Sequence, residues 1–342
     1  MKPGVVYDRR FADHSMGPDH PESPERILVL NRMLEEEAAG EFLPVTPRPA
    51  TEAEIAWIHE RGYIDFLKAT AGHELIALDA DTAAGPKTYE TALLAAGGFL
   101  SALDAILEGR VRNAMALVRP PGHHAEASRA MGFCFFNNVA IGAEYLVRRH
   151  GIRRVLIVDW DLHHGNGTQH AFYSRRDVLY FSTHQVPLYP GTGATRETGD
   201  GPGKGYNLNV PLRAGKGDED FLYIFRKILS PIAAQFEPEF VLVSAGFDIG
   251  RGDPLGGMLV DREGFGLLAD SLLAIAEQCC PGRVALVLEG GYDLPTLKNG
   301  VREVLGRLAR EVPAPLPDPA VSTVTARELE PCIRTFREAW EL

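Results

Sequence analysis

Three side chains that can bind a metal ion follow a short apolar run in the middle of the chain. The run, 155–158, has the β-branched composition of a buried strand. Asp159, Asp161 and His163 come next at alternate positions, and alternate side chains of an extended backbone point to the same face. The spacing therefore predicts part of a metal site. The alternative interpretation is a strand that ends in a polar turn, with carboxylates that are solvated or cap a helix.

Four further polar segments follow apolar runs of strand length. These segments are 119–124, 182–184, 244–248 and 289–292. The expected strands are 5–7, 115–118, 155–158, 178–181, 240–243 and 284–287, and the expected helices are 89–107, 138–149, 219–234, 262–278 and 294–310. This alternation predicts an α/β fold with an open parallel sheet covered by helices on both faces. Ligands bind beside the carboxyl ends of the strands in such sheets, so all five polar segments are expected at one site.

The composition bounds the class of protein. No Gly/Ser-rich, Pro-rich or low-complexity segment divides the 342 residues, so a single domain over residues 1–342 is expected. The net charge of -11 argues against a nucleic-acid binder with a broad basic face and suits cationic partners. The N-terminus lacks a signal sequence, and no apolar stretch is judged long enough to cross a bilayer. A cytoplasmic protein without a membrane is therefore expected.

The four cysteines form no CxxC pair. Adjacent Cys279 and Cys280 fall late in an expected helix, so we expect them to pack rather than to form a disulfide. A structural metal site or a disulfide framework built on cysteine is not predicted.

Asp248 offers a third metal ligand at the end of another strand. A catalytic zinc site takes three protein ligands and keeps one position for water or substrate. Asp161, His163 and Asp248 would place two carboxylates and one neutral imidazole around a dication, so the centre carries little net charge to bury. This mostly oxygen donor set also admits Fe(II), Co(II) or Mn(II). Alternatively, Asp248 caps a helix.

An adjacent pair, His123 and His124, follows a Pro-Pro-Gly turn. Two imidazoles beside a metal centre indicate proton transfer, whereas a lone histidine would more often be a packing residue. Asp159 is expected to hold His123 and Asn166 to hold His124. Because a carboxylate raises imidazole basicity more than an amide does, the two histidines should differ in pKa, and one of them could act as a base while the other stays protonated.

Tyr292 follows two glycines, Gly290 and Gly291, which allow a tight backbone path that aims the phenol inward. Beside a metal-bound carbonyl, its hydroxyl would stabilise a developing oxyanion. The alternative is a partly buried tyrosine that is hydrogen-bonded to the backbone.

Taken together, these motifs resemble the histone deacetylase family, in its class II branch. The matching segments are PGHHA at 121–125, GFCFFNN at 132–138, DWDLHHGNGTQ at 159–169, YPGTG at 189–193, AGFD at 245–248 with GDPLGG at 252–257, and EGGY at 289–292. The resemblance runs from about residue 7 to beyond residue 292. It implies the arginase-deacetylase fold, an open sheet of about eight strands with the active site at their carboxyl ends.

The resemblance assigns roles residue by residue. It implies zinc ligands at Asp161, His163 and Asp248, catalytic roles for His123, His124 and Tyr292 with Asp159 and Asn166 in support, and substrate contacts by Phe133, Tyr189, Gly132, Asp81, Leu255 and Gly290. It also implies a structural potassium ion at Asp159, Ser182 and Thr183 and a second one at Phe172, Arg175, Val178 and Tyr206. Asp81 resembles the aspartate at the rim of the site that holds the substrate backbone, and Asp79 is the alternative residue for that role. Asn166 stands where class I members have Asp, which leaves the protonation state of His124 open.

The implied reaction is the metal-assisted removal of acyl groups from lysine side chains. Acetylpolyamine hydrolysis is the nearest alternative, and Leu255 disfavours it because a polyamine-selective relative carries Glu there. A binuclear manganese ureohydrolase would need a second Asp where this chain has Gly250, so one metal per chain is expected. A non-catalytic acyl-lysine binder is a more remote alternative, because Tyr292 and the ligands are present. The physiological substrate, the preferred acyl group and the oligomeric state stay open.

Overall fold

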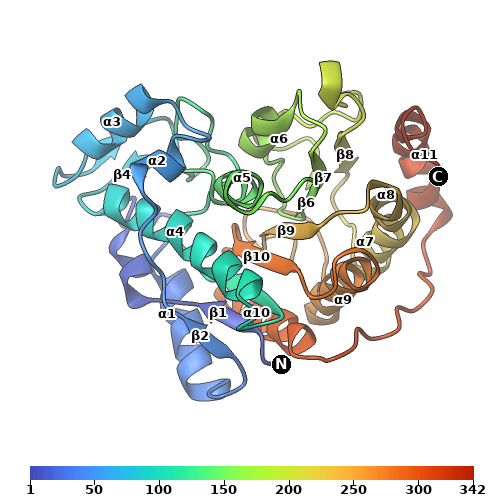
Figure 1. Cartoon of the computed structure of the whole chain (residues 1–342), viewed down its shortest axis with the longest axis horizontal. Helices are drawn as coiled ribbons and strands as arrows, with labels where there is room; N and C mark the ends of the chain where they lie inside the picture. Colours follow the sequence, from blue (N-terminus) through green and yellow to red (C-terminus); the bar gives the residue numbers. More distant parts are fainter.

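The computed structural model describes residues 1–342 and is built around one eight-stranded sheet (Figure 1). Its strands are β1 (Gly4–Val6), β2 (Leu43–Val45), β5 (Asn113–Ala116), β6 (Val155–Asp159), β7 (Val178–Gln185), β8 (Asn207–Leu212), β9 (Phe240–Ala245) and β10 (Val284–Leu288). They lie in the order β2-β1-β5-β10-β9-β6-β7-β8, and every pair is parallel. The prediction of an open parallel α/β sheet is confirmed. Two short antiparallel strands, β3 (Ile76–Ala77) and β4 (Ala83–Ala84), pair apart from it.

Helices cover the sheet on both faces. They are α1 (Glu25–Arg32), α2 (Glu52–Ile55), α3 (Arg61–Ala69), α4 (Thr88–Leu107), α5 (Asn138–His150), α6 (Asn166–Phe172), α7 (Asp218–Ile224), α8 (Ser230–Phe236), α9 (Arg262–Cys279), α10 (Leu294–Leu308) and α11 (Thr323–Phe336). Right-handed crossovers put α4, α5 and α6 on one face, because the chain there moves along the sheet in one direction. The chain then turns back from β8 to β9 and β10, which puts α7, α8 and α9 on the other face.

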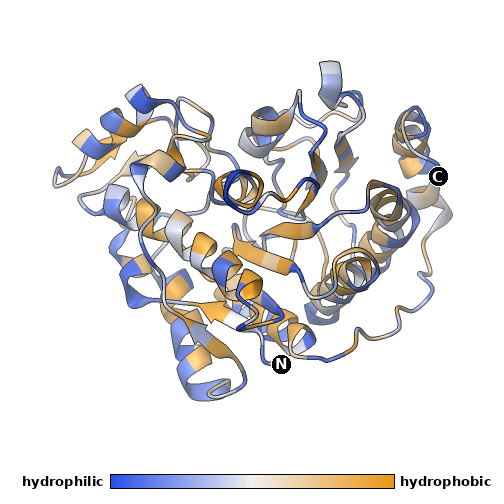
Figure 2. Ribbon diagram, in the orientation of Figure 1, coloured by the Kyte–Doolittle hydropathy of each residue, from blue (hydrophilic) through white to orange (hydrophobic).

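The central strands are buried on both faces. All residues of β5, β6, β9 and β10 are buried, and the strands appear as apolar arrows between the helices (Figure 2). Continuous apolar strands are typical of parallel sheets, because helices cover both sides. The strands therefore form a rigid support for the loops that leave their carboxyl ends.

One helix corrects an expectation about membranes. The 20-residue helix α4 is long and apolar enough to cross a bilayer, with a mean hydropathy of 1.4, although no such stretch was expected. However, 78% of this apolar window is buried inside the protein. Burial of this kind is typical of a core helix, and α4 packs against α5 and β5.

Several element boundaries differ from the sequence prediction. The expected helix 219–234 is two helices, α7 and α8, joined by a wider π-helical turn at Phe225–Leu229. The segment 182–184 was expected to be a loop, but it belongs to β7, which continues to Gln185. Strand β6 ends at Asp159, so the extended backbone that was expected to align Asp161 and His163 with it stops before them. The edge strands β2 and β8 were not anticipated.

Candidate active site

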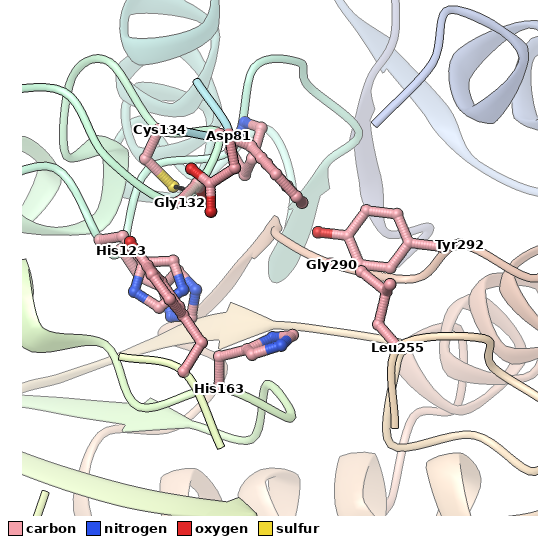
Figure 3. Close-up of a pocket in the computed structure, with 12 residues that line it drawn as sticks. Asp81, His123, Gly132, Cys134, His163, Leu255, Gly290 and Tyr292 are labelled. Carbon is pink, nitrogen blue, oxygen red and sulfur yellow. Dashed lines mark hydrogen bonds between the residues drawn. The ribbon is translucent and has the colours of Figure 1, made fainter. Parts of the chain in front are cut away.

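The loops after β5, β6, β9 and β10 meet at the carboxyl edge of the sheet. A cavity of about 120 Å³ opens there (Figure 3). Its lining residues are Asp81, Pro121, His123, His124, Gly132, Phe133, Cys134, His163, Tyr189, Leu255, Gly290 and Tyr292. Four of the five polar segments contribute to this edge as expected. Ser182 and Thr183 do not line the cavity, because they are buried strand residues of β7.

A cluster of three potential metal ligands lies at the base of the cavity. One ligand atom from each of Asp161, His163 and Asp248 lies within 4.8 Å of the other two. Backbone groups fix the two carboxylates: the Leu162 N–H donates to Asp248 Oδ1 (3.0 Å), and the Gly290 N–H donates to Asp161 Oδ2 (2.8 Å). The cluster that was expected from the sequence is therefore formed, although turns rather than a continued strand position Asp161 and His163.

The turn after β6 is held by successive carboxylates. The Asp161 N–H donates to Asp159 Oδ1 (3.1 Å), and the His163 N–H donates to Asp161 Oδ1 (2.9 Å). Aspartate favours such turns because its side chain can accept a hydrogen bond from the backbone two residues later. The alternating spacing thus produces the cluster through local hydrogen bonds.

The pKa values of the cluster and an oxygen atom without a hydrogen-bond partner both favour a cation at this position. Burial, followed by the charge of Asp161, raises the pKa of Asp248 to about 7. Burial opposes protonation of His163, but the adjacent carboxylates of Asp161 and Asp248 raise its pKa to about 9. The buried Asp248 Oδ2 has no hydrogen-bond partner, and the nearest cationic atom, His163 Nδ1, is 3.3 Å away. Two buried carboxylates thus lie close enough to disfavour each other's ionisation, and a dication bound between them would remove that repulsion.

The backbone of Gly290 lies directly against the cluster. A Cβ atom at this position would lie 2.2 Å from Asp248 Oδ2 and 2.7 Å from Asp161 Oδ2. Such contacts are far below van der Waals separation, so only glycine fits here.

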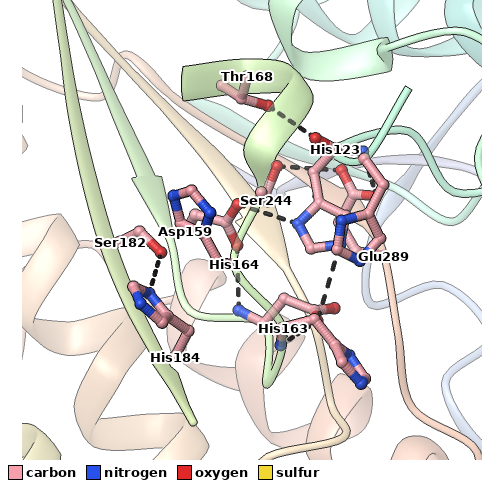
Figure 4. A network of polar contacts seen from close by, with 12 residues as sticks. His123, Asp159, His163, His164, Thr168, Ser182, His184, Ser244 and Glu289 are labelled. Carbon is pink, nitrogen blue, oxygen red and sulfur yellow. Dashed lines mark hydrogen bonds and ion pairs between the residues drawn. The ribbon is translucent and has the colours of Figure 1, made fainter. Parts of the chain in front are cut away.

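The two adjacent histidines have different partners. His123 Nδ1 lies 3.0 Å from Asp159 Oδ2, and His124 Nδ1 lies 2.8 Å from Asn166 Oδ1. Figure 4 shows Asp159 beside the His123 ring. Burial lowers the pKa of His123, but Asp159 and Asp161 outweigh it and raise the pKa to about 10. Burial and the positive charges of His123 and His163 hold the pKa of His124 well below its ordinary value.

Glu289 belongs to the EGGY motif at 289–292, but no role for it was predicted from the sequence. Its fully buried carboxylate accepts the N–H groups of Gly122 (2.7 Å) and His123 (3.1 Å) at Oε2, and the Ser244 hydroxyl (3.0 Å) at Oε1 (Figure 4). Burial raises the pKa of Glu289 to about 7. It therefore joins the end of β10 to the loop that carries the histidine pair. The sequence feature that could have identified Glu289 is its position, as a charged residue directly after an apolar strand.

Aromatic rings wall the cavity. The Tyr189 ring packs edge-on against His124, with centroids 5.1 Å apart, and Phe133 packs edge-on against Tyr292 at 5.9 Å. Gly132 and Phe133 both have positive φ, at 55° and 68°. A Cβ on Gly132 would lie 2.5 Å from His124 Cδ2, so this close approach of backbone to imidazole requires glycine.

The rim has one acidic side chain and one apolar one. Asp81 lines the cavity together with Leu255. Asp79 does not line it, and its Oδ1 instead accepts the N–H groups of Asp81 (3.0 Å) and Thr82 (2.7 Å). Asp79 therefore shapes the turn, and Asp81 is the one of the two that faces the cavity.

Tyr292 faces the histidines across the cavity, with its hydroxyl directed inward (Figure 3). Behind it, the buried Arg26 guanidinium lies 5.0 Å from the ring centroid and donates to the Gly291 carbonyl (2.7 Å). The sequence analysis gave Arg26 no role, since nothing local connects it with residue 291.

The residues expected at two monovalent sites lie near β7. Ser182 pairs with Asp159 across β6 and β7, and the buried Thr183 hydroxyl has no hydrogen-bond partner. The residues of the second expected site lie near Val178, at the start of β7. There, the Phe172 carbonyl accepts a hydrogen bond from the Arg175 N–H (2.9 Å), and the Tyr206 carbonyl accepts one from the Tyr180 N–H (2.9 Å). Each group is thus placed close to β7.

Comparisons with known proteins show the fold and the family. Residues 20–308 match the histone deacetylase domain model. The chain is 39% identical over 297 residues to a probable deacetylase of Archaeoglobus fulgidus, covering 86% of this chain and 82% of that protein. It is 38% identical over 304 residues to a histone deacetylase-like amidohydrolase of Pseudomonas aeruginosa, covering 87% and 80%. Against histone deacetylase HDA1 of Candida albicans it is 38% identical, covering 92% of this chain but 41% of that longer protein.

A solved structure shows the same architecture. The crystal structure of the HDA15 HD domain superposes with a TM-score of 0.92 at 36% identity, covering 99% of this chain and 95% of that one. The sheet and site define an amide-hydrolysing enzyme of the arginase-deacetylase fold. The chain belongs to the histone deacetylase family.

Proposed function

We propose that this enzyme is a zinc-dependent amidohydrolase that removes acetyl or related acyl groups from lysine side chains of proteins or peptides. The shape of the cavity carries this proposal. It is small, with a volume of about 120 Å³, is lined by Phe133 and Tyr189, and reaches His163 of the ligand cluster. A slender apolar chain that ends in an amide matches such a slot, because methylenes pack well against aromatic faces.

Asp161, His163 and Asp248 would hold the zinc ion, and Fe(II) or Co(II) would suit the same donors. A metal bound there supplies Lewis-acid chemistry, which polarises the acyl carbonyl and acidifies a bound water. Two structural potassium ions are part of the proposal, one beside Asp159, Ser182 and Thr183 and one near Phe172, Arg175, Val178 and Tyr206. The unpartnered Thr183 hydroxyl supports the first of them.

The histidine pair would move the protons of the hydrolysis. His124 is held neutral by burial and so can accept a proton from the attacking water. His123, whose pKa Asp159 and Asp161 raise to about 10, is held protonated and can donate to the leaving amine. Tyr292 would donate a hydrogen bond to the oxyanion that forms on the substrate carbonyl. Asn166 beside His124 favours the class II assignment.

Acetylpolyamine hydrolysis is the second candidate, and one observation favours it. Asp81 lines the cavity and could attract the free amine of a short cationic substrate. Leu255, at the same cavity, offers that amine no charge. A peptide substrate instead gains apolar contact from Leu255, which is why the acyl-lysine proposal is preferred.

Steady-state kinetics separate the candidates. We expect a higher kcat/KM for an acetyl-lysine peptide than for acetylputrescine, with release of free acetate. A matched variant, Leu255→Glu, should shift the ratio toward acetylputrescine. A wild-type preference for acetylputrescine would reverse the substrate assignment, and binding of the peptide without acetate release would leave only a non-catalytic acyl-lysine binder.

A further inference from the structure

The side-chain amide of Asn166 lies between His124 and an acidic residue, Glu126. Its Oδ1 lies 2.8 Å from His124 Nδ1, and its Nδ2 donates to a carboxylate oxygen of Glu126. Glu126 follows the histidine pair by two residues, but no local pattern in the sequence indicates a role for it. Glu126 in turn accepts from His170 Nδ1, at 2.9 and 3.0 Å to its two oxygens.

The amide group has nearly the same shape in either of its two orientations, so its neighbours decide which end faces His124. An ionised carboxylate can only accept hydrogen bonds. It therefore stabilises the orientation in which the NH₂ group faces Glu126 and disfavours the reverse, which would bring two oxygens together. The His124 carbonyl accepts from the same Nδ2 at 3.2 Å, but it is neutral and its bond is weaker than the charge-assisted one.

Glu126 is well placed to enforce this choice. Its side chain is 14% exposed, and burial raises its pKa, but hydrogen bonds from His170 and Asn166 outweigh burial and keep the pKa below its ordinary value. Its backbone is fixed as well, because its N–H donates to the Arg129 carbonyl (3.0 Å) and its carbonyl lies 2.9 Å from His59 Nδ1. The carboxylate thus stays ionised and in place.

We propose that Glu126 is a positioning residue that sets the tautomer of His124 through Asn166. With the amide oxygen directed at His124, Nδ1 must carry the proton and donate it to Oδ1. Nε2 then carries the free lone pair that a general base needs. The catalytic consequence rests on the proposed function, whereas the tautomer itself does not.

Nitrogen NMR of histidine-labelled, zinc-loaded protein tests the tautomer directly. In Glu126→Gln the new amide can donate as well as accept, so we expect His124 to lose its single Nδ1–H tautomer and to sample both. We also expect kcat to fall about 10-fold or more, with KM changed much less and the acidic limb of the pH profile, which reports the general base, displaced. Glu54→Gln is the matched control, since Glu54 is likewise a glutamate held in an ion pair, in its case with Arg48, but it lies away from the cavity.

A double variant guards against a purely structural effect. In Asn166→Asp combined with Glu126→Gln, the group beside His124 can only accept, so the Nδ1–H tautomer should return although Glu126 is absent. An unchanged tautomer in Glu126→Gln would overturn the proposal, even if kcat fell. A double variant that failed to restore the tautomer would also overturn it. If the wild-type protein hydrolyses no acyl-lysine, the proposed function fails while the NMR result still decides the role of Glu126.

Discussion

The carboxylate of Asp253 accepts the backbone N–H of Tyr292 at 2.7 Å, and the same oxygen accepts the N–H of Asp293 at 3.1 Å. Asp253 is 5% exposed and follows β9, whereas Tyr292 follows β10. Two loops are thus joined directly behind the phenol. Asp253 therefore determines where the Tyr292 backbone lies.

Asp253→Ala should lower both stability and activity. Two partly buried N–H groups would lose their acceptor, at a cost of up to about 1–3 kcal/mol each. The loop that carries Tyr292 would loosen, so we expect kcat to fall about 10- to 100-fold, measured by acetate release from an acetyl-lysine peptide. Asp293→Ala is the control, because it removes only the side chain that caps α10 and leaves the Tyr292 N–H bonded. Equal losses of kcat in both variants would contradict a specific role for Asp253.

Tyr292→Phe should remove the oxyanion donor and retain the ring. The phenyl group would keep its contacts with Phe133 and Arg26, so the fold should be unaffected. Loss of one such donor typically lowers kcat about 10²- to 10³-fold, and we expect that range here with little change in KM. Tyr145→Phe, whose hydroxyl bonds Asp104 outside the cavity, should behave as wild type. Full activity in Tyr292→Phe would refute the role proposed for its hydroxyl.

Gly290→Ala should abolish metal binding. The new methyl group would lie 2.2 Å from Asp248 Oδ2, so either that carboxylate or the loop must move. We expect substoichiometric zinc in the purified variant, measured by inductively coupled plasma mass spectrometry. Gly306→Ala provides the control, because its helical site has no heavy atom within 4 Å of the added Cβ and the change should be neutral or stabilise the helix by up to about 1 kcal/mol. Full zinc occupancy in Gly290→Ala would contradict this prediction.

His59 should make the fold sensitive to acid. Its Nδ1 lies 2.9 Å from the Glu126 carbonyl and its Nε2 accepts the Asn137 N–H (2.9 Å), so the ring is held neutral. Burial lowers its pKa to about 4, below the ordinary value of 6.5. Between these values the unfolded chain binds more protons, so the contribution of His59 to the free energy of unfolding should fall as the pH falls from about 6.5 to about 4, and level off below that.

One such site contributes about 1.4 kcal/mol per pH unit, or about 3 kcal/mol over the whole window. Urea unfolding at several pH values measures the slope. His59→Gln keeps one donor and one acceptor but cannot titrate, so the slope should be smaller in this variant. It should not vanish, because burial also lowers the pKa of His184 to about 4. The exposed His73→Gln serves as the control, and a wild-type slope in His59→Gln would contradict the prediction.

The metal cluster could be predicted from sequence because its ligands immediately follow apolar strands. Asp161 and Asp248 each lie within a few residues of a strand end, and the topology of parallel sheets brings such ends together. The contributions of Glu289 and Glu126 could not be predicted in the same way. Their roles depend on hydrogen bonds to Gly122 and Asn166, which are fixed only when the whole chain folds.

Strand β8 shows why an edge of the sheet was missed. Asn207 and Asn209 make its sequence polar, and Pro211 cannot donate a ladder hydrogen bond. In the fold, both asparagine side chains donate to Gln169 Oε1 of α6, at 2.9 and 2.7 Å. A strand whose polar side chains are satisfied by a distant helix lacks the apolar pattern on which the prediction relied.

The position of β10 has a consequence for biosynthesis. This strand is the last of the sheet to be made, yet it lies between β5 and β9 near the centre. A nascent chain that ends before Val284 would therefore leave two interior strand edges without a partner, and exposed edges of apolar strands favour aggregation. We expect the sheet to close only after β10 has been made, so that chaperones which hold nascent chains should improve the yield of soluble enzyme.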